Sequence, residues 1–131
     1  MCGLASKLAC PEFRLFLQSY DIVGLQETKT DMSDTIQVPG YSSFIYSRRS
    51  LSRYRSGGIA LLVKESLSPY VSVDKHGKSD LIKFFTINKA IYGNQSEKKE
   101  DLICGIVYIP PSSSRFAVND PYFDIQNEIS N

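Results

Sequence analysis

Short apolar segments of strand length dominate the sequence, separated by glycine, proline or polar residues. We expect β-strands at Ile22–Gln26, Ser43–Ser47, Ile59–Lys64, Leu81–Ile87 and Leu102–Ile109. Pro39 and Gly40 mark a turn, and Pro110 and Pro111 end the last strand because proline cannot donate a hydrogen bond to a sheet. The uninterrupted apolar run of the first strand is typical of a strand that is covered on both faces.

Helices are expected near both ends of the chain. In Pro11–Ser19 proline suits a first helical turn, and the following aromatic and leucine side chains recur at helical spacing. Pro121–Ile129 shows a similar spacing of apolar residues. The polar, lysine-rich stretch Asn88–Glu100 is expected to be a long solvated loop within a hairpin. This order of elements predicts an α/β protein of the α+β type, in a single domain.

Composition limits the classes of function. The chain has 131 residues, and a hydrophobic content of 42% is enough to bury a core. A formal net charge of +1 gives no general attraction to nucleic acids or membranes. The three cysteines show no metal-binding spacing, and no apolar run reaches the length of a membrane-spanning helix. We therefore expect reduced thiols, no membrane partner and an intracellular location, nuclear or cytoplasmic.

One strand ends in a carboxylate. The segment DIVGLQETKT, from Asp21 to Thr30, passes from apolar residues to Glu27 without a spacer. A strand holds its terminal side chain rigidly, so Glu27 is a candidate ligand for a hard cation such as Mg²⁺. The alternative is a carboxylate that only faces solvent at a strand end.

Further motifs follow this one in a fixed order: VPGYSSF from Val38, RSGGIALLVKE from Arg55 and GIVYIPP from Gly105. Together with LQETKT they resemble the endonuclease/exonuclease/phosphatase superfamily. Within it they are most similar to the endonuclease domain of non-LTR (LINE-type) retrotransposons, which are relatives of the apurinic/apyrimidinic endonucleases. The resemblance implies a partial four-layer α/β-β/α sandwich of the DNase I-like fold. It also implies that residues 1–131 are the N-terminal portion of one such domain, without its first strand and its C-terminal half.

The resemblance assigns two catalytic residues. Glu27 matches the metal-binding carboxylate, with Mg²⁺ or Mn²⁺ as the cofactor, and Tyr108 matches a tyrosine whose hydroxyl is directed at the phosphate. A core tyrosine is the alternative for Tyr108. The superfamily's asparagine on the first strand, its GDxN-type motif and its late histidine have no match, and His76 does not lie at the catalytic histidine's place.

These matches imply a fragment of a Mg²⁺-dependent DNA endonuclease that nicks retrotransposon target sites and is inactive as this isolated chain. The alternative is a non-catalytic remnant of a decayed retroelement that binds nucleic acid weakly. DNA is the expected partner, and no small-molecule cofactor is expected. A basic stretch favours DNA contact through Arg48, Arg49, Arg53 and Arg55, although a solvated loop accounts for it equally well.

Overall fold

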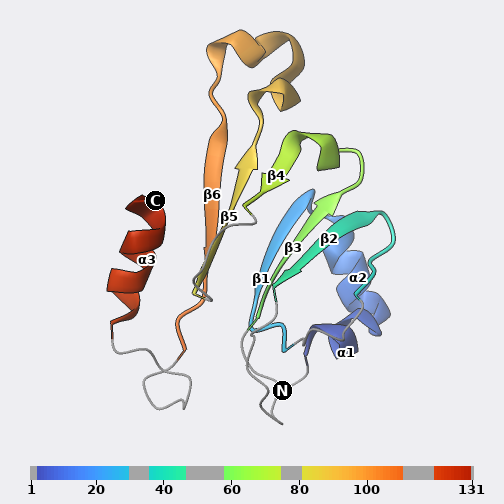
Figure 1. The fold of residues 1–131 in the computed structure, drawn as a ribbon. Helices are drawn as coiled ribbons and strands as arrows, with labels where there is room; N and C mark the ends of the chain where they lie inside the picture. The colour runs from blue at the N-terminus through green and yellow to red at the C-terminus, as the bar shows by residue number, and fades with distance from the viewer. Residues whose placement is uncertain (1–2, 30–35, 47–57, 75–80, 111–119, 131) are drawn as a thin grey trace.

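Two three-stranded antiparallel sheets pack face to face in the computed structural model of the protein, with helices on their outer sides (Figure 1). The structure describes residues 3–29, 36–46, 58–74, 81–110 and 120–130. The elements are α1 (Leu4–Leu8), α2 (Pro11–Gln18), β1 (Ile22–Gln26), β2 (Tyr41–Tyr46), β3 (Ile59–Lys64), the 3-10 helix η1 (Ser68–Tyr70), β4 (Val71–Val73), β5 (Ile82–Ile87), the 3-10 segment η2 (Lys89–Lys98), β6 (Leu102–Val107) and α3 (Pro121–Ser130).

Sheet A has the strand order β1-β3-β2, so β3 is its central strand. Residues Ile59 to Val63 of β3 are at most 1% exposed, because both faces of this strand are covered. On the outer face, Leu62 packs in one cluster with Leu17 of α2 and with Val38 and Tyr41. On the inner face, the side chains of β3 meet the second sheet. The strand therefore lies at the centre of the sandwich, packed on the helical layer with one face and on sheet B with the other.

Sheet B has the strand order β4-β5-β6 and supplies the other half of the inner layer. Leu61 and Val63 of sheet A form a buried cluster with Val71 of β4 and Phe85 of β5. The sheets approach closely where β1 faces β6. A Cβ atom at Gly24 would lie 3.1 Å from Cδ1 of Ile106, so glycine is the residue that admits this contact. The two sheets therefore form one sandwich core.

The end of α2 is tied to sheet A by Tyr41. Its buried hydroxyl lies 2.6 Å from the carbonyl oxygens of Leu17 and Tyr20. The last carbonyl groups of a helix have no partner within the helix, and the single phenolic proton can be shared between these two. Tyr41 thereby holds α2 against the outer face of β2, the side of the sandwich on the right of Figure 1. The helix α3 lies on the opposite side, beyond sheet B.

The layered arrangement confirms the predicted fold class, with helices outside two packed antiparallel sheets. The boundaries of β1 and β3 agree with the sequence prediction, and the other predicted strands and helices differ by up to two residues at their ends. Both faces of β1 carry packing, because Val23 and Leu25 pack on the α2 side and Ile22 packs on the side of sheet B. The strand is an edge of the described sheet, with Gly24 and Gln26 exposed, and the most completely covered strand is β3.

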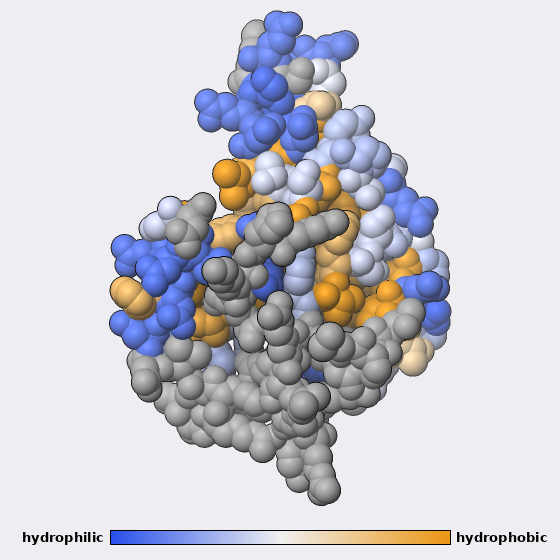
Figure 2. Space-filling model, viewed as in Figure 1, coloured by the Kyte–Doolittle hydropathy of each residue, from blue (hydrophilic) through white to orange (hydrophobic). Residues whose placement is uncertain are grey.

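Several elements were not expected from the sequence. The helix α1, the 3-10 turn η1 and the short strand β4 are too brief for a periodic pattern to develop. The predicted loop after β5 instead contains η2, which is interrupted at Gly93 by a positive φ of 59°. Its described side chains form the hydrophilic tip at the top of Figure 2. Among the described helices, none has the length and apolarity to span a membrane.

Candidate active site at the strand ends

A hydrogen bond joins the two sheets at one end of the sandwich. The side-chain amide nitrogen of Gln26, the last residue of β1, donates to the main-chain carbonyl oxygen of Val107, the last residue of β6. Glu27 directly follows the first of these residues, and Tyr108 directly follows the second. The bond therefore places both candidate catalytic residues at the same end of the sandwich, the end far from η2 (Figure 1).

The backbone at Glu27 has an uncommon conformation. Its φ is +52°, and Lys29 has a φ of +54°. Positive φ brings Cβ close to the main chain in residues other than glycine, so it is uncommon outside asparagine, aspartate and glycine. Strained residues of this kind gather where the surrounding structure holds a functional group in place. The side chain of Glu27 is half-buried, so its carboxylate lies where the protein surface meets solvent.

Thr28 anchors the segment that carries this strain. It is the one buried polar residue of the described core, with a side chain that is 3% exposed. Its backbone N–H donates to the carbonyl of Gly58 at 3.3 Å, and its carbonyl accepts from the N–H of Leu4 at 2.8 Å. Two main-chain contacts on the residue after Glu27 restrict how far the carboxylate can move.

Tyr108 extends the ladder of sheet B beyond the end of β6. Its N–H donates to the carbonyl of Leu81 at 2.7 Å, which continues the antiparallel register of β5 and β6 by one step. Side chains alternate along a strand, so Tyr108 faces the same side as Ile106, which packs toward sheet A. Tyr108 is half-buried, and the buried Pro110 lies two residues further along the chain. Tyr108 therefore lies at the end of the layer between the sheets where β1 ends at Gln26 and β6 ends at Val107, an end called the mouth below.

A second contact between the sheets lies at this mouth. The Nζ atom of Lys83, on β5, lies 5.2 Å from the centre of the Tyr46 ring, at the end of β2. Burial raises the pKa of the Tyr46 hydroxyl above its ordinary value of 10.0, and the negative charge of Asp74 raises it further. Tyr46 is therefore a neutral hydrogen-bond donor at physiological pH.

Glu27 fits a divalent metal as a single protein ligand. Among the residues that the structure describes, no cluster of three or more histidine, cysteine, aspartate or glutamate side chains could hold an ion. Mg²⁺ commonly uses one or two carboxylates and completes its octahedron with water and substrate phosphate oxygens. Glu27, a half-buried carboxylate at a strand end, could serve as one such ligand.

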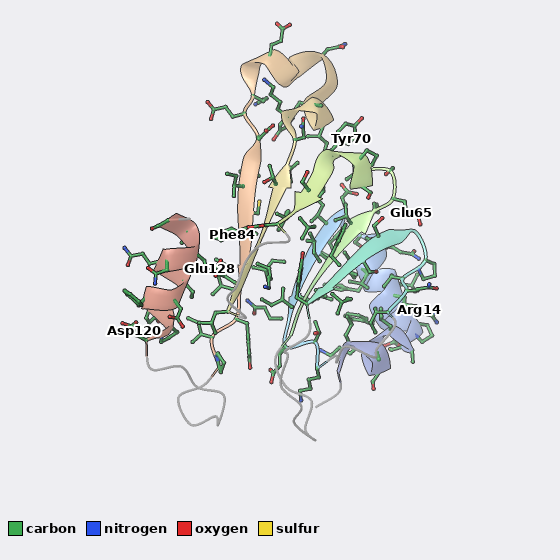
Figure 3. All side chains as sticks on the ribbon, viewed as in Figure 1. Arg14, Glu65, Tyr70, Phe84, Asp120 and Glu128 are labelled. Atoms are coloured by element: carbon green, nitrogen blue, oxygen red, sulfur yellow. The ribbon has the colours of Figure 1, made fainter. Side chains whose placement is uncertain are left out.

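A separate surface hollow of about 330 Å³ lies between α2 and the turn before β2. Its lining includes Arg14, Leu15, Pro39 and Tyr41, and none of the residues predicted for the site. Figure 3 shows Arg14 in the helical layer outside sheet A, while Glu128 lies on α3, on the other side of the sandwich. This hollow is therefore distinct from the mouth between the sheets.

The sequence-predicted residues divide into two groups. Glu27 and Tyr108 lie at the same end of the sandwich, although their catalytic roles stay predictions. The arginines at positions 48, 49, 53 and 55 lie outside the described residues, so their role in DNA contact is untested. Sequence reasoning missed Gln26, Lys83 and Tyr46. A signal for Lys83 was present, because this lysine alternates with the apolar Phe85 and Ile87 on one face of the predicted strand.

The protein is of the α+β class, with two packed sheets and helices outside them. Its candidate site lies at strand ends, where polar side chains gather at one end of the layer between the sheets. Residues 12–120 match the sequence profile of the Endonuclease/Exonuclease/phosphatase family. This match covers most of the chain, and the chain belongs to that family. No curated protein and no solved structure gives a significant match.

Proposed function

We propose that this chain is part of a DNA endonuclease that hydrolyses phosphodiester bonds with the help of Mg²⁺, or Mn²⁺ in its place. The observation that carries the proposal is the close approach of β1 and β6, where Ile106 packs on Gly24 and the Gln26 amide contacts the Val107 carbonyl, so that Glu27 and Tyr108 follow their strands at one mouth. Membership of the family supports a phosphoester-cleaving activity. A DNA substrate is consistent with a nuclear or cytoplasmic location.

The two residues have different roles in this proposal. Glu27 binds the metal through its carboxylate, and the strained backbone fixes where that carboxylate points. A bound divalent ion supplies positive charge beside the phosphate. Tyr108 donates a hydrogen bond from its hydroxyl to a phosphate oxygen, on which negative charge grows as the bond to the leaving group breaks. Neither residue deprotonates the attacking water, so further residues are needed to complete the site.

The amino-acid sequences of the motifs support a retrotransposon subtype within this family. LQET, VPGY and GIVYIPP are closer to the endonucleases of non-LTR elements than to inositol-polyphosphate phosphatases or sphingomyelinases. On this proposal the physiological reaction is the nicking of a genomic target site. A non-catalytic remnant that binds nucleic acid weakly is the alternative. An in-frame GDxN motif and a late histidine motif after the codon for Asn131 would favour the enzyme, and an early stop codon would favour the remnant.

Metal binding can be tested on the chain itself with Mn²⁺, whose unpaired electrons broaden the NMR signals of nearby nuclei. We expect Mn²⁺ to broaden the backbone amide signals at residues 26–28 and 107–109 before those of η2, because the proposed ligand lies at the mouth. Glu27→Gln should abolish the selective broadening, since a neutral amide loses the charge that attracts the ion.

The matched control is Glu12→Gln, which removes an exposed carboxylate from the first turn of α2. This variant should keep the broadening pattern of the unmodified chain. Equal broadening at η2 and at the strand ends, or a pattern that Glu27→Gln leaves unchanged, would remove the metal site from the proposal.

A further inference from the structure

The layer between the sheets changes from apolar to polar at the end that carries Glu27 and Tyr108. Lys83 pairs directly with Ile106 across β5 and β6, and paired residues of an antiparallel ladder face the same side. The side chain of Ile106 packs on Gly24 of sheet A, so Lys83 also faces the space between the sheets. Lysine seldom occupies such a position, because its charge is costly to remove from water.

The neighbours of Lys83 place it beside the candidate site. Tyr108 opposes Leu81, two residues before Lys83, so Lys83 and Tyr108 are diagonal neighbours on one face. The main-chain spacing of such neighbours is about 7–8 Å. On sheet A, both Gln26 of β1 and Tyr46 of β2 pair with Ile59, one from each side. The Lys83–Tyr46 contact and the Gln26–Val107 bond therefore lie at the same end of the sandwich.

The Tyr46 ring gives Lys83 a defined position. A cation over an aromatic face is attracted by the negative charge of the π-system, and this attraction is stronger where water is partly excluded. Among the described residues, the negative charge of Asp74, which directly follows β4, acts on the Tyr46 hydroxyl, and Lys83 lies over the ring. The contact with the ring can thus hold the ammonium group at the mouth.

We propose that Lys83, positioned by Tyr46, contacts a backbone phosphate of the bound DNA strand next to the phosphate at Glu27 and Tyr108. This inference rests on the proposed function, because it adds a residue to the same substrate site. An ammonium group is a compact charge on a flexible stem, which suits a phosphate near the reacting one. The contact is made to the DNA backbone, so it contributes affinity without sequence preference.

DNA binding tests the proposal without requiring cleavage. Binding of a short fluorescein-labelled DNA duplex is followed by fluorescence anisotropy in EDTA, over a series of salt concentrations. Lys83→Met should weaken binding by roughly 3- to 10-fold at low salt and should reduce the slope of log K against log salt by about 0.9, the value for one lost phosphate contact. Lys83→Arg should retain most of the affinity, because the positive charge is kept.

The chain offers a matched control. Lys99 also lies over a tyrosine ring, with Nζ 5.5 Å from the centre of Tyr92, but this pair belongs to the η2 region at the far end of the sandwich. Lys99→Met removes the same charge and the same type of contact, and it should change neither the affinity nor the salt slope. An equal effect of the two methionine variants would mean that only overall charge matters, and it would overturn the proposal.

A measurement on the unmodified chain avoids any effect of substitution on folding. Lysines are acetylated with an amine-reactive ester with and without the DNA duplex, and the extent at each site is read by mass spectrometry. DNA should slow acetylation of Lys83 and leave Lys99 unchanged. If the chain binds DNA but Lys83 is acetylated equally in both samples, the proposed role of Lys83 is overturned and the proposed function is not. If the unmodified chain fails to bind DNA at low salt, both the role of Lys83 and the DNA endonuclease proposal are overturned.

Discussion

The amide group of Gln26 and the carbonyl oxygen of Val107 are joined by a hydrogen bond although they are 81 positions apart in the chain. Each of these residues is the last of its strand, and each precedes a residue proposed for catalysis. The relative position of Glu27 and Tyr108 therefore depends on how the two sheets pack, and not on either strand alone.

We predict that Gln26→Leu lowers the free energy of unfolding by about 1 kcal/mol, since it removes the donor and leaves the Val107 carbonyl without this partner. Urea unfolding followed by circular dichroism measures the change. Gln37→Leu is the control, because Gln37 is an exposed residue before the turn to β2. If the two leucine variants are equally stable, the bond between the sheets contributes nothing to the fold.

Replacing Glu27 by glycine should separate stability from metal binding. Glycine adopts positive φ freely, so Glu27→Gly should raise the stability above that of Glu27→Ala by about 1 kcal/mol. Both variants should lose the selective Mn²⁺ broadening. Lys29→Gly, at a φ of +54°, should give a similar gain over Lys29→Ala and keep the metal response. A glycine variant at position 27 that is less stable than the alanine variant would argue against backbone strain.

Tyr108→Phe is predicted to lower kcat by on the order of 10²-fold in a chain joined to the C-terminal half of a related endonuclease. The substitution removes the hydroxyl that donates to the phosphate and keeps the ring that packs at the end of β6. The metal concentration at half-maximal activity should stay unchanged, whereas Glu27→Gln should raise it. In the double variant, kcat should fall by a smaller factor than the product of the two single-variant factors if both residues act on one transition state. Unchanged turnover in Tyr108→Phe would return this residue to a packing role.

The 131-residue chain by itself is predicted not to nick supercoiled plasmid in Mg²⁺. Hydrolysis needs a water that is deprotonated and held opposite the leaving group, and Glu27 and Tyr108 supply neither step. Gel electrophoresis of plasmid incubated with purified chain measures nicking. Cleavage that EDTA abolishes and that Glu27→Gln also abolishes would contradict this prediction, because contamination by another nuclease would not respond to the substitution.

The stability of the fold should fall in strongly alkaline solution through Tyr46. Its pKa is raised in the folded chain above 10.0, by burial first and by Asp74 second, so the folded state holds this proton more tightly. The contribution is fully present below the unfolded pKa of about 10 and is lost as pH rises through the folded pKa. Unfolding in urea at about pH 8 and about pH 11 should show a smaller loss for Tyr46→Phe than for the unmodified chain. An equal loss in both proteins would show that other groups control the alkaline transition.

Much of the fold follows from local pattern. The apolar runs that form β1 and β3, and the helical spacing in α2, are properties of a few neighbouring residues, so they were predicted within narrow limits. The brief elements α1, η1 and β4 were missed because each is formed by its packing and carries little pattern of its own. The edge position of β1 was not predicted either, because an apolar run does not reveal whether its strand is central or at an edge.

The sequence by itself determined the family, the strand-end carboxylate at Glu27 and the phenol at Tyr108, because motifs of this kind are contiguous. Only the tertiary structure decided that these two residues share a mouth, that Gln26 bridges the sheets there and that Lys83 meets Tyr46 between them. These contacts join residues from different sheets. Their geometry depends on how the sheets pack, and packing is a property of the whole chain that no local stretch of sequence contains.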